Sequence, residues 1–102
     1  MPQRIDPSEI ATKEQFGQRL TLLRERAGLS TRDLAREAGL PLATLAGYLS
    51  GRHLPQAGSR KQMLKVLAVC GVIGEAADDW MDAVGRARRA DRRRAPGRLS
   101  AP

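Results

Sequence analysis

The chain has 102 residues, which is room for one domain, and 18 lysines and arginines against 11 acids give it a net charge of +7. Aromatic residues make up only 3% of a sequence that is 41% hydrophobic, and no strict alternation is present, so packed helices are expected rather than a sheet. One cysteine and one histidine exclude an internal disulfide and a cysteine-based zinc cluster, and they offer no credible catalytic pair.

The first two helices are marked by their ends. Residues 1–11 contain two prolines and no helical period, so a flexible lead-in is expected there. Thr12 opens a capping-box pattern that begins the first helix, and Gly28 is placed to end it. Ser30 is expected to cap a second helix of about two turns, which Gly39 stops because glycine adopts a positive φ without strain.

Two further helices follow in the same manner. The third begins at Leu40-Pro41, since proline is tolerated in the first turn of a helix, and it ends at Gly51. Ser59 is expected to cap the fourth helix, and Gly71 closes it.

A fifth helix is expected from Glu75, with a buried apolar stripe that includes Trp80. Residues 86–98 carry seven arginines and one acid, a local charge of +6. The last stretch, residues 91–102, is therefore expected to be a basic, disordered tail, which leaves residues 12–90 for the folded domain.

Residues 31–50 have the form of a helix-turn-helix, two short helices separated by a tight glycine turn. Ala35 is small where the two helices approach, and Gly39 stands four residues later, at the turn. An ordinary antiparallel pair within a bundle is the alternative interpretation. The sequence thus predicts a compact all-α domain of four or five helices, with the helix-turn-helix as helices 2 and 3.

Residues 16–71 resemble the lambda repressor-like, or XRE-type, helix-turn-helix family. The residues that carry the resemblance are Leu23-Arg24, Gly28-Leu29-Ser30, Leu34-Ala35, Ala38-Gly39-Leu40, Thr44-Leu45 and Gly51. Residues 47–55 are further similar to actinobacterial members. The resemblance implies a bacterial DNA-binding domain whose third helix enters the major groove.

The positions that the resemblance places against the bases are unusual because their side chains cannot make hydrogen bonds. They are Leu42, Ala43, Ala46 and Gly47. Such residues cannot read guanine or adenine directly, although the first two suit thymine methyl groups and Gly47 would permit a close approach. Thr44 and Ser50 remain as polar candidates.

The sequence offers more candidate residues for contacts with DNA phosphates than for hydrogen bonds with bases. Thr31 stands where family members usually carry a phosphate-anchoring glutamine. The basic candidates are Arg32 and Arg36 on the second helix, and Arg52, His53, Arg60 and Lys61 around the loop that follows the third helix. These contacts give affinity without sequence information. A solvated basic surface is the alternative for each of them.

The function expected from these features is a DNA-binding transcriptional regulator with modest direct base readout. Two alternatives stay open: a protein-interaction module that uses the apolar outer face of the helix-turn-helix, and the N-terminal DNA-binding part of a larger regulator. Double-stranded DNA is the expected partner, with a homodimer or a protein partner also open. No enzyme activity, cofactor, metal or membrane is expected, and the expected location is cytoplasmic and nucleoid-associated.

The position of the turn can be tested by Gly39→Val. A β-branched residue resists positive φ, so we expect the free energy of unfolding to fall by about 1–3 kcal/mol. Urea or thermal unfolding measures this loss, and an unchanged melting temperature would place the turn elsewhere.

Overall fold

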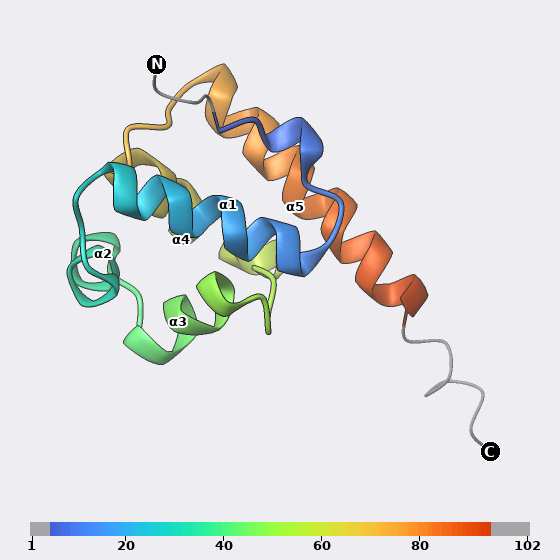
Figure 1. Cartoon of the computed structure of the whole chain (residues 1–102), viewed down its shortest axis with the longest axis horizontal. Coiled ribbons are helices and arrows are strands. Elements are labelled where there is room, and N and C mark those ends of the chain that lie inside the picture. Colours follow the sequence, from blue (N-terminus) through green and yellow to red (C-terminus); the bar gives the residue numbers. More distant parts are fainter. Residues whose placement is uncertain (1–4, 95–102) are drawn as a thin grey trace.

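The computed structural model describes residues 5–94, and helix α1 (Lys13–Arg26) begins in it at the predicted capping box (Figure 1). The Gln15 amide donates to the Thr12 hydroxyl at 3.1 Å, and the Thr12 amide donates to Gln15 Oε1 at 3.1 Å. After the helix, Gly28 has a φ of +73°. Arg24 then fastens the turn, because its guanidinium donates to the Leu29 carbonyl at 2.6 Å.

The helix-turn-helix consists of α2 (Thr31–Ala38) and α3 (Leu42–Ser50). The Asp33 amide donates to the Ser30 hydroxyl at 3.0 Å, which confirms Ser30 as the cap of α2. Gly39 has a φ of +73° and its amide bonds back to α2, as the predicted turn requires. Pro41 precedes α3 as its N-cap, so the helix begins one residue later than the proline.

Helices α4 (Arg60–Val69) and α5 (Glu75–Arg94) complete the described part. The predicted cap at Ser59 is wrong in its detail. Ser59 ends a short 3-10 helix, η2 (Ala57–Ser59), and its side chain makes no capping hydrogen bond. This 3-10 turn leads directly into α4 and takes the place of a side-chain cap.

The N-terminal segment differs from the flexible lead-in expected from the sequence. Within residues 5–11 the chain forms a 3-10 helix, η1 (Pro7–Glu9), and Ile10 is fully buried in the core. Arg86 holds this segment against α5 by donating to the carbonyls of Pro7, at 2.8 Å, and Ile10, at 3.3 Å. Residues 1–4 of the expected lead-in lie outside the described residues.

Helix α5 also continues further than expected, to Arg94 rather than to residue 90. Arginine is a good helix former, and Asp91 pairs with Lys13 of α1 at 3.2 Å, so the helix has both propensity and a tertiary partner in this region. The rest of the predicted tail, residues 95–102, lies outside the described residues.

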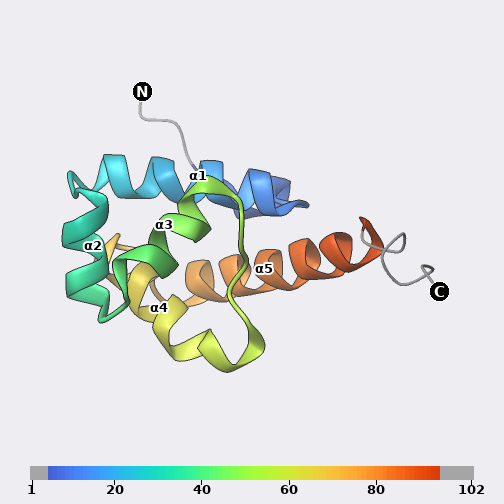
Figure 2. The ribbon, with the colours of Figure 1, turned by 90° about the horizontal axis from the view of Figure 1, so that it is seen from below.

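One hydrophobic core joins all five helices. Trp80 is only 2% exposed, which confirms its predicted burial, and its ring meets Phe16 edge-to-face with centroids 6.2 Å apart. Figures 1 and 2 show α1 lying across α3 on one side and beside α5 on the other. The described residues contain helices and no strand, the all-α class predicted from the sequence.

The crossing of α1 and α3 depends on Gly17. A Cβ atom at this position would lie 2.7 Å from the Leu49 carbonyl oxygen and 2.8 Å from both the Tyr48 carbonyl oxygen and the Gly51 amide nitrogen. All three atoms belong to the backbone and cannot turn aside. The Thr21 hydroxyl lies beside the crossing and donates to the Gly17 carbonyl at 2.8 Å. Only glycine therefore lets the two helices approach this closely.

We expect Gly17→Ala to lower the free energy of unfolding by about 1–3 kcal/mol, because α3 must shift to admit a methyl group. Gly85→Ala is the matched control. Gly85 also lies inside a helix, yet a Cβ there meets only the end of the Arg89 side chain, at 3.5 Å. Alanine at position 85 should raise the free energy of unfolding by about 0.5–1 kcal/mol. Equal effects of the two substitutions in chemical denaturation would contradict the close crossing.

Candidate nucleic-acid interface

The outer face of α3 carries the small and apolar side chains predicted to meet the bases. Leu42 is 43% exposed, Ala43 is exposed and Ala46 is half-buried, whereas Leu45 and Tyr48 point into the core. Thr44 is half-buried on the same helix. The exposed face of α3 therefore has an apolar surface bordered by few hydrogen-bonding groups.

Gly47 lies in a different environment from the one expected. It is buried, and a Cβ atom there would overlap the imidazole of His53, with Nε2 at 3.0 Å. The His53 amide also donates to the Gly47 carbonyl, at 3.3 Å. The imidazole thus packs on the α-carbon of Gly47, so the ring and not bare backbone forms this part of the surface.

A short chain of hydrogen bonds joins the end of α3 to the loop. The Ser50 hydroxyl donates to the Gly47 carbonyl at 3.1 Å, and Arg52 Nε donates to the Ser50 oxygen at 3.1 Å. Arg52 and His53 are both exposed. The structure therefore brings Ser50, Arg52 and His53 together beside the C-terminal end of α3.

The remaining predicted phosphate contacts are spread over α2 and the start of α4. Arg32 and Lys61 are exposed, and Thr31 is half-buried at the first turn of α2. Arg36 donates to Asp33 at 2.9 Å, and Arg60 lies 3.9 Å from Asp78. These two ion pairs are solvent-exposed, and such pairs are weak enough for a phosphate to compete with the carboxylate.

Two cations near this surface were not selected from the sequence. Arg88 and Arg92 of α5 line a groove together with Arg52 and His53. From the sequence they belong to one undifferentiated run of arginines. Their i, i+4 spacing places both on one face of a helix, but Arg89 and Arg93 share that spacing, so only the tertiary structure distinguishes the two pairs.

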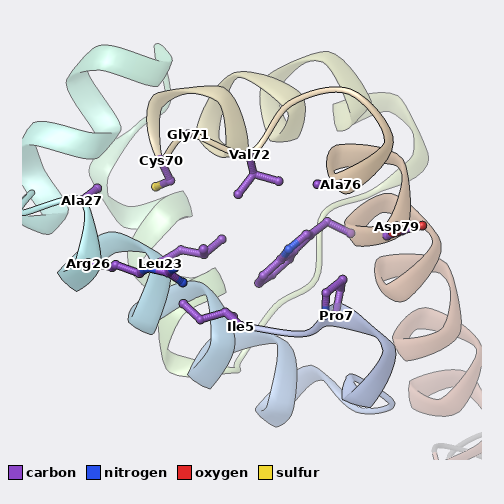
Figure 3. Close-up of a pocket in the computed structure, with 11 residues that line it drawn as sticks. Ile5, Pro7, Leu23, Arg26, Ala27, Cys70, Gly71, Val72, Ala76 and Asp79 are labelled. Carbon is purple, nitrogen blue, oxygen red and sulfur yellow. The ribbon is translucent and has the colours of Figure 1, made fainter. Parts of the chain in front are cut away.

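A cavity of about 380 Å³ lies on another part of the molecule, and Arg26, Cys70 and Asp79 are its only lining residues with an ionisable side chain (Figure 3). Leu23, Val72 and Trp80 form its apolar walls, and the Cys70 thiol lies at its edge. Burial raises the pKa of the Cys70 thiol, and the nearby Arg24 charge lowers it by less. The thiol is therefore neutral near pH 7 and a poor nucleophile.

Within residues 5–94 no group of three metal-ligating side chains comes together. None of the helices in this part of the chain is both long and apolar enough to cross a membrane.

The packing of His53 on Gly47 can be tested with Gly47→Ala. The added methyl group displaces the imidazole, an exposed side chain that can move, so stability should change by less than about 1 kcal/mol. The His53 ring signals in an NMR spectrum should shift clearly, and they are simple to assign because the chain has one histidine. Gly85→Ala should leave these signals in place. Unaltered signals in Gly47→Ala would show that the ring lies elsewhere.

The family model described as Helix-turn-helix domain matches residues 15–80, which is more than half of the chain. Comparisons with curated proteins and with solved structures gave no match. The matched range includes α1 from Gln15 onward, α2 to α4 and the first turns of α5, so it contains both helices of the predicted motif and most of the core that supports them. The chain belongs to the helix-turn-helix domain family, which indicates a DNA-binding regulator.

Proposed function

We propose that this domain binds double-stranded DNA with α3 in the major groove and that most of its affinity comes from arginine and lysine contacts with phosphates. The observation that carries the proposal is the surface around α3. An exposed apolar helix face, with Leu42 and Ala43, is bordered by exposed cations on α2 and on the loop. One surface thereby combines a helix that fits the DNA major groove with cations that attract the two phosphate backbones beside the groove.

Direct base readout should be modest in this arrangement. Each good bidentate pair between a side chain and a base gives about 1–3 kcal/mol of discrimination, and Leu42, Ala43 and Ala46 can form none. Leu42 and Ala43 can contact thymine methyl groups. Further preference would come from the shape of the groove or from the half-site spacing of a homodimer.

The cations should differ in what they contribute. Arg32, Arg52 and Lys61 are exposed and have no ion pair among residues 5–94. Each of them can therefore contact a phosphate without first breaking an ion pair with a carboxylate. Arg36 and Arg60 must first leave Asp33 and Asp78. We therefore expect the first three to account for more of the affinity, with His53 and Ser50 placed to assist beside Arg52.

A second candidate function is a protein-docking module, and the 43% exposure of Leu42 on α3 favours it. The same surface would then bury apolar area against a partner protein, with little dependence on salt. DNA binding instead requires a steep decrease in affinity with rising salt, because each phosphate contact releases counterions.

We infer a regulator of transcription, alone or as part of a larger protein, that acts in the cytoplasm on the nucleoid.

The proposal is tested by Ala43→Glu, which places an anion on the outer face of α3. Affinity for duplex DNA should fall by about tenfold or more, because the carboxylate would face the phosphates. Ile73→Glu is the matched control, since Ile73 is 70% exposed in the turn between α4 and α5 and makes the same change of charge. Titration of both variants with a duplex at several salt concentrations measures the effect.

Equal affinities of the two variants for DNA would show that α3 does not enter the groove. A wild-type affinity that hardly varies with salt would favour the protein-docking function.

A further inference from the structure

A groove of about 500 Å³ lies between the loop that follows α3 and the C-terminal half of α5. Figure 2 shows this loop crossing over α5 in projection before it reaches α4, and residues of both segments line the groove. Arg52 and His53 line the groove from the loop, and Arg88 and Arg92 line it from α5. Two segments that are distant in the sequence thus direct cationic side chains into one concave surface.

The side chains that line the groove carry an excess of positive charge. It contains three arginines and one acid, Asp91. Asp91 is already paired with Lys13 of α1, Nζ to Oδ1 at 3.2 Å, so its charge is balanced from outside the groove. An anion in the groove would therefore meet the three guanidinium groups without a net opposing charge.

Arg88 has an unsatisfied hydrogen-bonding group. Its Nε is buried and has no hydrogen-bond partner among the described residues. Arg24 Nε is in the same state away from the groove, so this atom does not by itself mark a site. What supports the site is that Arg88 lines the groove, because a guanidinium group is well suited to the oxygen atoms of a phosphate. Arg92 follows one helical turn later on the same face of α5, so a phosphate could be held between the two side chains.

We propose that this groove binds a backbone phosphate of the duplex held at α3, so that α5 extends the DNA contact beyond the helix-turn-helix. The inference rests on the proposed function. Arg52 and His53 belong both to the groove and to the surface beside α3, which makes the two sites continuous. The 20-residue α5 is about 30 Å long, enough to lie along several phosphates of a duplex.

The test compares two double variants of α5 that remove the same charge. Arg88→Gln with Arg92→Gln empties the α5 side of the groove, whereas Arg89→Gln with Arg93→Gln removes two exposed arginines that do not line it. For the groove variant we expect DNA affinity to fall by about tenfold and the slope of log K against log salt to lessen by about one, the value for one phosphate. The control variant should change both quantities far less. Equal changes in the two variants would overturn the groove as a site.

Stability is followed in parallel, because Arg88 is half-buried. If the Arg88 and Arg92 double variant has a lowered melting temperature, two single variants give the same comparison. Arg92→Gln then replaces the groove variant and Arg93→Gln replaces its control, since both arginines are exposed. Wild-type protein that binds no duplex would overturn the proposed function and this inference together. A third outcome would overturn only the inference. In that case Ala43→Glu abolishes DNA binding, but the Arg88 and Arg92 double variant binds DNA as tightly as the Arg89 and Arg93 double variant.

Discussion

The contact between the backbones of α1 and α3 at Gly17 determines where the helix-turn-helix lies on the domain. The Tyr48 and Leu49 carbonyls and the Gly51 amide come within contact distance of this one α-carbon. With α3 held so closely on its inner side, its apolar outer face is fixed relative to α2 and to the following loop. The proposed DNA contacts on these three segments therefore depend on a glycine that lies on the opposite side of α3.

The proposed interface separates two physical tasks. The face of α3 supplies shape and apolar contact, and it carries almost no group that could hydrogen-bond to a base. The positive charge comes from other elements: α2, the loop after α3 and, by our inference, α5. A change in direct contacts with the bases would thus require substitutions on α3, whereas affinity for any duplex could be adjusted on the surrounding elements without altering α3.

Local signals allowed most element boundaries to be predicted from the sequence, because a cap such as Thr12 or Ser30 and a turn glycine such as Gly39 act within a few residues. Contacts between distant segments could not be predicted. Gly17 and Gly85 look alike in the sequence, and only tertiary packing distinguishes them. The burial of Ile10 depends in the same way on segments far along the chain. Within the site, the outward position of Ala43 was an expectation from the resemblance to the helix-turn-helix family, and Ala43 is exposed in the structure.

The packing of the His53 imidazole on Gly47 has a consequence for how sequences of this kind diverge. A ring can occupy this surface only while position 47 has no side chain, and a glycine inside a helix is otherwise unfavourable. The two positions are therefore epistatic: the value of glycine at 47 depends on which residue stands at 53, and the converse also holds. Diverging homologues should then exchange both residues together, which would alter the surface beside α3 in one coordinated step.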